Sequence, residues 1–214
     1  MVTDEQPSQP VQGEPTFSHS LHTDQRSAFD PNMLREEWAV VLDFLQHGYA
    51  SGRATPRSQL PIVQAIGRER FALLELIPKR DVVLQPHEEV YIGDGKRDKI
   101  HHIKGRLPFD ELTATAQSQI EPILTKLVAK SEARFVDFFN KAQPMTTRMH
   151  QLELLPGLGK KHMWGILDAR KEKPFERFQD IRDRVRLMPD PRALIVRRIL
   201  GELNGKEKHR VFVR

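Results

Sequence analysis

The sequence contains no cysteine, has few aromatic side chains and lacks any long apolar run. The absence of cysteine excludes disulfides, zinc held by cysteine and a cysteine nucleophile. No apolar stretch approaches the roughly 20 residues that a membrane-spanning helix requires. The N-terminus shows no charged segment followed by an apolar core, so no secretory signal is visible. We therefore expect a cytoplasmic protein that uses no cofactor and has no membrane partner.

The positive charge of the chain is concentrated in its last third. The net charge is +5 overall. Residues 1–35 carry −3, residues 36–143 are neutral, and residues 144–214 hold seventeen basic and nine acidic side chains. A basic segment of this kind is the expected electrostatic signature of a module that binds a polyanion. The alternative is a helical domain with a solvated basic face.

Composition and periodicity divide the chain into five parts. Residues 1–35 are polar and acidic without a helical or strand period, which predicts a disordered tail. The later parts predict an α+β fold, in which a small OB-like β-barrel is followed by helices. Its expected divisions are a β domain at 36–107, linking helices at 108–143, a duplicated helical hairpin domain at 144–205 and a basic tail at 206–214. The tail is expected to be a short strand or a flexible arm.

Short apolar runs separated by turn residues recur between residues 38 and 103, at a spacing typical of a small barrel or sandwich. The expected strands are 38–45, 61–66, 71–77, 82–84, 90–92 and 99–103. For 61–66, one helical turn is the alternative. A glycine-rich turn at 93–95 precedes the basic side chains of Lys96, Arg97, Lys99 and Lys104. Loops of OB-like barrels commonly bind single strands. These four residues are therefore candidate nucleic-acid contacts, whereas Tyr91 is expected to pack.

Two helices should follow the β domain. Residues 114–130 carry apolar side chains at helical spacing, and residues 132–141 add three phenylalanines. Pro122 interrupts the first pattern, and we expect it to mark the first turn of a helix that begins near Glu121.

The most informative stretch is a tight turn between two helical patterns at residues 154–161. Thr146 or Thr147 is expected to cap the first helix, which Pro156 ends because proline has no amide donor. Gly157 and Gly159 are expected to adopt backbone angles that a side chain forbids. The next helix then begins with free amides, which attract phosphate through the helix dipole.

This turn resembles the helix-hairpin-helix motif, which binds nucleic acids without reading their sequence. The alternative is a plain turn between packed helices. The motif makes the following residues candidate phosphate contacts: Pro156, Gly157, Leu158, Gly159, Lys160 and Lys161. A second copy is expected at 173–203, where Asp190 repels phosphate and Pro191 lacks an N–H. Only the first copy should therefore bind phosphate. The last helix is nevertheless expected to approach the nucleic-acid backbone through Arg192, Arg197 and Arg198.

Five sequence blocks carry a wider resemblance: 90–95, 135–140, 152–157, 159–164 and 188–191. Together they resemble a prokaryotic, mainly archaeal, domain-of-unknown-function family, number 655, over roughly residues 36–204. The resemblance implies an OB-like barrel followed by a helix-hairpin-helix domain and a predicted RNA- or DNA-binding role. It also implies protein partners in the translation machinery.

Catalytic alternatives rest on weaker patterns. The adjacent His101 and His102 should point to opposite faces of a strand, so they should not share a metal ion. Two pairs of acids, Glu88 with Glu89 and Asp94 with Asp98, could form a metal site for phosphodiester cleavage. Basic residues lie among them, which disfavours such a site. Lys160 as a lyase nucleophile lacks an acidic partner. Trp164 is expected to pack, with base stacking as the alternative.

The sequence therefore favours a non-catalytic protein that binds nucleic acid, with RNA preferred over DNA. Phosphate contacts position a strand without reading its sequence. A scaffold that docks proteins in translation or repair assemblies is one alternative. A DNA-binding or nucleic-acid-processing enzyme is the other.

Overall fold

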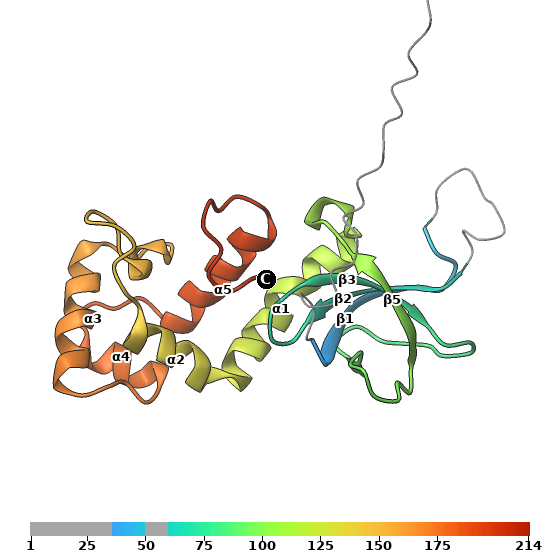
Figure 1. The fold of residues 1–214 in the computed structure, drawn as a ribbon, viewed down its shortest axis with the longest axis horizontal. Helices are drawn as coiled ribbons and strands as arrows, with labels where there is room; N and C mark the ends of the chain where they lie inside the picture. The colour runs from blue at the N-terminus through green and yellow to red at the C-terminus, as the bar shows by residue number, and fades with distance from the viewer. Residues whose placement is uncertain (1–35, 50–59) are drawn as a thin grey trace, which may run out of the picture. The chain divides into compact units, whose positions relative to one another are not determined.

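The computed structural model describes residues 36–49 and 60–214 (Figure 1). The tail predicted at 1–35 lies outside the described residues. Within them, five strands precede the helices, so the fold is α+β. The elements are β1 (Trp38–Leu45), β2 (Ile62–Gly67), β3 (Leu73–Pro78), β4 (Glu89–Tyr91), β5 (Ile100–Arg106), η2 (Phe109–Glu111), α1 (Ala114–Lys130), α2 (Glu132–Lys141), η3 (Gln151–Leu154), α3 (Lys160–Glu172), α4 (Phe178–Arg184) and α5 (Pro191–Leu203).

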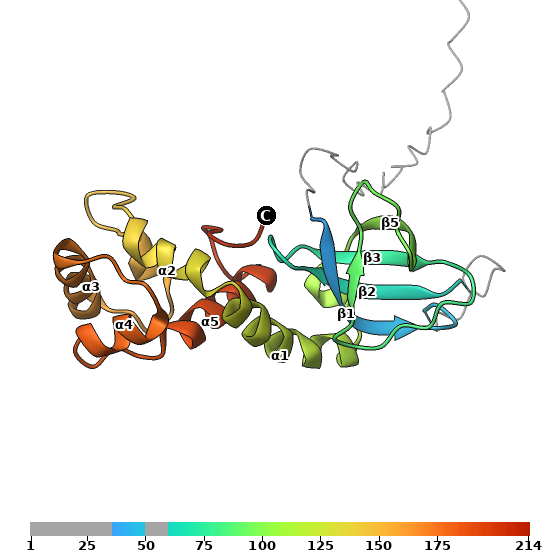
Figure 2. The same cartoon turned by 90° about the horizontal axis from the view of Figure 1, so that it is seen from below.

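The strands form one antiparallel sheet in the order β4-β1-β2-β3-β5. The sheet curls into a half-barrel (Figure 2). No pairing between β4 and β5 closes it in the part of the chain that the structure describes. Five of the six expected strands are present. The strand expected at 82–84 is wrong, because these residues form an irregular connection in which Leu84 is buried and Val83 is exposed.

Both faces of the sheet are buried at its central strands β1, β2 and β3, which explains why β1 is apolar without alternation. Val40 and Leu42 face a core that they share with the helices. Ala39 and Val41 face the inside of the half-barrel, where a second core lies. A strand covered on both faces has no position for a solvated side chain until its end.

Helix α1 connects the sheet to the later helices, because it packs against β1, β2 and α5. Its N-cap is Thr113, whose Oγ1 accepts from Ala116 N at 3.0 Å and donates to Asp43 Oδ2 at 2.6 Å. The expectation that Pro122 lies in the first turn is wrong, since the helix begins eight residues earlier, at Ala114, and runs through it. Ile120 and Ile123, on either side of the proline, are both buried in the same core.

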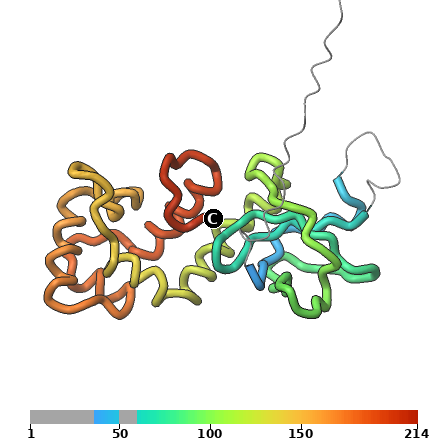
Figure 3. The backbone as a smooth tube through the Cα atoms, in the orientation of Figure 1, coloured from blue at the N-terminus to red at the C-terminus, as the bar shows by residue number. Residues whose placement is uncertain are grey.

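The C-terminal tail, expected to be a short strand or a flexible arm, is instead tied to α5. The buried carboxylate of Glu202 accepts the amides of Val211, Phe212 and Val213, each at 2.9 Å. Phe212 also packs edge-to-face against Phe135 of α2. Figure 3 shows the tail turning back from the end of α5.

The expectation that Arg198 approaches nucleic acid is also wrong. Its side chain is 2% exposed, and it pairs with Glu202 at 2.8 Å and with Glu207 at 2.7 Å. It further donates to Leu154 O at 2.8 Å, and its guanidinium therefore holds α5, the tail and η3 together.

Candidate functional site

The predicted turn is present, but the element before it is not a regular helix. Residues 151–154 form a single 3₁₀ turn, η3. Its N-cap is His150, whose Nδ1 accepts from Leu152 N at 3.1 Å, while Glu153 Oε2 accepts from His150 N at 2.8 Å. The caps expected at Thr146 and Thr147 are therefore wrong, because Thr146 instead closes a small turn with Met149.

The two glycines of the turn have different reasons to be glycine. Leu158 N donates to Leu155 O at 3.1 Å, and Gly157 lies between them with a φ of +91°. A proline followed by a residue of positive φ is typical of a type II turn, and this requires glycine. Gly159 instead has φ −84° and ψ 173°, which any residue adopts, so the expectation of forbidden angles is wrong there. A Cβ at Gly159 would meet nothing within 4 Å.

Four consecutive backbone amides point out of the start of α3 without an acceptor. Among residues 36–49 and 60–214, no atom accepts from the amides of Gly159, Lys160, Lys161 or His162. Gly159 is the N-cap and has no side-chain oxygen to satisfy them. Orphan amides at the positive end of a helix dipole form a ready site for an anion.

Positive charge surrounds these amides. Lys160 and Lys161 are exposed, and neither forms an ion pair with a residue that the structure describes. Trp164 also lies on α3, four residues after Lys160 and three after Lys161. It is 58% exposed. The expectation that Trp164 packs is therefore wrong. Residues at these spacings are neighbours on a helix surface, so Trp164 lies on the same side of α3 as the two lysines.

The second hairpin has the same turn but a different helix start. Met188 N donates to Val185 O at 3.2 Å, and Leu187 between them has a φ of +56°. The following helix α5 is capped by Asp190, whose Oδ1 accepts from Arg192 N at 3.1 Å. Pro191 has no N–H. The second start therefore carries an acid where the first carries glycine, as the sequence indicated.

His162 connects the two turns. Its Nε2 donates to Leu187 O at 3.0 Å, which fixes the proton on this nitrogen in the neutral ring. The other nitrogen, Nδ1, is buried without a partner among the described residues. This bond places the start of α3 against the second turn.

His150, the N-cap of η3, is a titratable group whose pKa is shifted. Burial, followed by the nearby charge of Arg170, lowers the pKa of the His150 imidazole below its ordinary value. The neutral ring is the form whose Nδ1 can accept from Leu152. Neutral His150 therefore stabilises η3, which leads directly into the turn.

The basic residues predicted on the β domain do not gather into one free cluster. Lys99 pairs with Glu88, and Lys104 pairs with Glu75 at 2.8 Å. Arg97 donates through Nε to Gly93 O at 2.9 Å. Lys96 has no partner in the described ranges.

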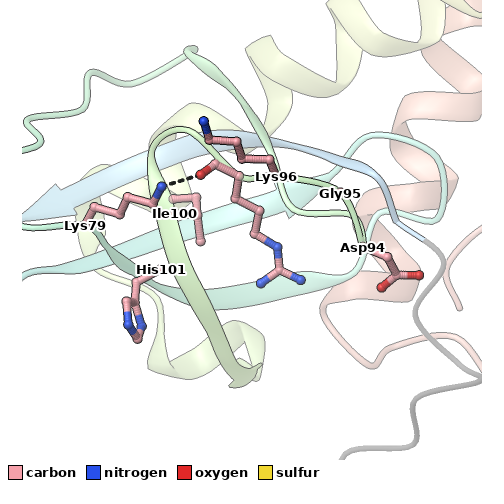
Figure 4. Close-up of a pocket in the computed structure, with 7 residues that line it drawn as sticks. Lys79, Asp94, Gly95, Lys96, Ile100 and His101 are labelled. Carbon is pink, nitrogen blue, oxygen red and sulfur yellow. Dashed lines mark hydrogen bonds between the residues drawn. The ribbon is translucent and has the colours of Figure 1, made fainter.

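Two of these residues, Lys96 and Arg97, line an open pocket together with Lys79, Asp94 and His101 (Figure 4). The ammonium of Lys79 donates to Arg97 O. Asp94 brings a negative charge to the rim. This carboxylate would repel a phosphate that enters the pocket.

The prediction that His101 and His102 point to opposite faces of a strand is wrong. A bulge in β5 at this point, between the partners of Ile77 and Pro78, places both rings on the exposed side. Their Nδ1 atoms lie 2.7 Å apart. No group of three or more His, Asp or Glu side chains in the described residues is arranged to hold a metal ion.

His162 is a part of the site that the sequence pattern did not reveal. The signal of the motif lay in the two lysines, whereas the amide of His162 is also free and its ring contacts the second turn. The capping role of His150 was missed as well. The signal for it was Glu153 three residues later, the spacing of a capping box.

Comparison with known proteins identifies relatives over nearly the whole described chain. Residues 35–214 match the family described as "Protein of unknown function (DUF655)". An uncharacterized protein of Methanocaldococcus jannaschii is 42% identical over 181 residues, which cover 84% of this chain and 80% of that protein. A crystal structure of a DUF655 protein from Archaeoglobus fulgidus superposes with a TM-score of 0.76 at 39% identity, covering 84% of this chain and all of the other.

The chain therefore belongs to the DUF655 family, and relatives occur in archaea. No helix in the described residues is long and apolar enough to cross a membrane.

Proposed function

We propose that this protein binds nucleic acid, with RNA preferred over DNA, by holding backbone phosphates at the start of α3 in the manner of a helix-hairpin-helix motif. The supporting observation is the row of four acceptor-free amides at residues 159–162. An amide row of this kind, at the positive end of a helix and beside two lysines, suits a phosphate oxygen.

The open space beside Gly159 supports the same proposal. A strand can reach the amides only if no side chain covers them, and a Cβ at this position would contact nothing in the protein. Glycine is thus retained where the backbone angles do not demand it. Close approach of a ligand to the backbone is a physical reason for this choice.

Trp164 extends the proposed contact from phosphate to base. Single-stranded nucleic acids bind basic grooves in which aromatic side chains stack on successive bases. An exposed indole next to Lys160 and Lys161 offers such a face. We propose that the half-barrel, which packs against α1, is OB-like. Its basic pocket around Lys96 is a weaker contact than the start of α3.

A salt series tests the proposal. Fluorescence anisotropy with a labelled single-stranded RNA and the matching DNA should give an association constant whose logarithm falls linearly with the logarithm of the salt concentration. The slope should drop by roughly 0.7 for each phosphate interaction that Lys160→Gln/Lys161→Gln removes. Lys206→Gln/Lys208→Gln, which removes two exposed charges from the tail, is the matched control and should keep the slope.

Absence of binding to both RNA and DNA at low salt overturns the proposal. An equal decrease of the slope in the two double variants also overturns the assignment to α3, because it would mean that only net charge matters. Stronger binding to DNA than to RNA overturns the preference for RNA alone.

A further inference from the structure

A second polar pocket lies where the starts of α4 and α5 meet α2, and it involves none of the residues of the first turn. Its lining includes three arginines, Arg177, Arg182 and Arg192, and two acids, Glu132 and Asp190. Three guanidinium groups against two carboxylates leave the pocket with a net charge of +1, which attracts an anion.

None of the three guanidinium groups has an ion-pair partner among residues 36–49 and 60–214. By contrast, two other arginines of the C-terminal helices are satisfied: Arg198 has two carboxylates, and Arg184 donates to Lys173 O at 2.8 Å. The Nε atom of Arg192 is moreover buried and has no hydrogen-bond acceptor. A buried donor without an acceptor is rare in native proteins and calls for a partner.

The two acids of the pocket are already engaged by the backbone. Glu132 Oε1 accepts from Phe178 N at 2.6 Å, and Asp190 Oδ1 accepts from Arg192 N at 3.1 Å. These bonds position the starts of α4 and α5. The arginines line the pocket without an ion-pair partner among the described residues, and their fork-shaped donors match phosphate oxygens.

We propose that this pocket binds a phosphate group through Arg192, with Arg177 and Arg182 as additional donors. The second hairpin lacks the free amides of the first, because Asp190 caps its helix and Pro191 has no N–H. Arginine side chains therefore supply the donors that the backbone does not. This site is separate from the proposed function, since inorganic phosphate suffices to probe it.

The test is a titration of the full chain with inorganic phosphate, followed by ¹H–¹⁵N NMR at constant ionic strength. At about 20 mM phosphate, a dissociation constant in the millimolar range is detectable. The resonances of Phe178 N–H, Arg192 N–H and Arg192 Nε–H should shift. Arg192→Gln should weaken binding at least about tenfold, equivalent to about 1.4 kcal/mol.

Arg210→Gln, which removes an exposed charge outside the pocket, should leave phosphate binding unchanged. Because Arg192 is partly buried, Arg182→Gln on the exposed face of α4 provides a second variant, which should also weaken binding. Unperturbed resonances at Phe178 and Arg192, or equal affinities of Arg192→Gln and Arg210→Gln, overturn the proposal.

A second arm distinguishes the source of the phosphate. Oligonucleotides with and without a 5′-phosphate are compared with wild type and Arg192→Gln. If the pocket binds a terminal phosphate, the wild type should bind the phosphorylated strand more tightly than the unphosphorylated one, and Arg192→Gln should abolish this difference. An internal phosphate predicts an equal decrease in affinity for both strands.

The same arm separates this site from the first turn. If Gly159→Ser weakens strand binding while Arg192→Gln changes neither strand nor phosphate binding, this inference fails and the proposed function stands. If phosphate binds at Arg192 but no strand binds to the protein, the proposed function fails and this inference stands.

Discussion

Replacing Gly159 with serine should stabilise α3 and weaken nucleic-acid binding. Gly159 is an N-cap with extended angles, and its Cβ position is open, so serine fits without strain. Its hydroxyl would accept from the amide of Lys161 or His162, and we expect the free energy of unfolding to rise by a few tenths of a kcal/mol. The amide it engages is one that the proposal assigns to phosphate.

The weaker binding follows from that competition. A hydrogen bond to a charged group contributes about 1.5–3 kcal/mol, so removing one should weaken binding roughly 10- to 100-fold. A rise in stability together with a fall in affinity cannot come from unfolding. The two signs therefore separate a ligand contact from a structural role.

The assay pairs chemical denaturation with anisotropy on a single-stranded RNA. Gly105→Ser is the control, because a Cβ at Gly105 of β5 also meets nothing within 4 Å and this residue lies outside the turn. Unchanged affinity of Gly159→Ser, at wild-type stability or above, would refute the reasoning that these amides bind the strand.

Three further predictions concern the surroundings of the site. Trp164→Ala should weaken binding of a single strand by about 1–3 kcal/mol and that of a duplex much less, as measured by anisotropy. The pKa of His150 is lowered in the folded protein, so the stabilisation by neutral His150 is full above the ordinary imidazole pKa of 6.5. It is lost as the pH falls through the folded pKa. His150→Asn keeps a capping acceptor and should flatten this pH dependence of the unfolding free energy in urea titrations. Glu202→Gln breaks the buried pair with Arg198 and should cost about 3 kcal/mol in urea unfolding.

Each of these predictions has a contrary outcome. Equal decreases in affinity for single strands and duplexes would mean that Trp164 supports the fold and does not stack. If the unfolding free energy of His150→Asn depends on pH as in the wild type, another group is responsible for the pH dependence. His87→Asn is the comparison variant. A cost of less than about 1 kcal/mol for Glu202→Gln would mean that Arg198 finds another partner.

The β domain and the helices were largely predictable, because burial there is written as continuous or periodic apolar runs. The apolar run of β1 predicted a buried strand, and α1 followed its helical period despite Pro122. The proline misled because local propensity disfavours it within a helix, whereas packing of Ile120 and Ile123 keeps the helix continuous. The tail at 206–214 was misjudged, since its order depends on the distant carboxylate of Glu202.

At the site, the turn was predictable from Pro156 and Gly157, whose residue types specify a type II turn. The roles of Gly159 and Trp164 were not predictable, because they depend on what lies next to each position in space. A glycine in an extended conformation looks the same in sequence as one with positive φ. The exposure of Trp164 likewise depends on which face of α3 packs against the second turn.

The most direct measurement is the structure of the protein bound to a short single-stranded RNA. The account predicts a backbone phosphate whose oxygens lie within about 3 Å of the amide nitrogens of Gly159, Lys160 and Lys161. A strand bound elsewhere, with these amides still facing solvent, would contradict it.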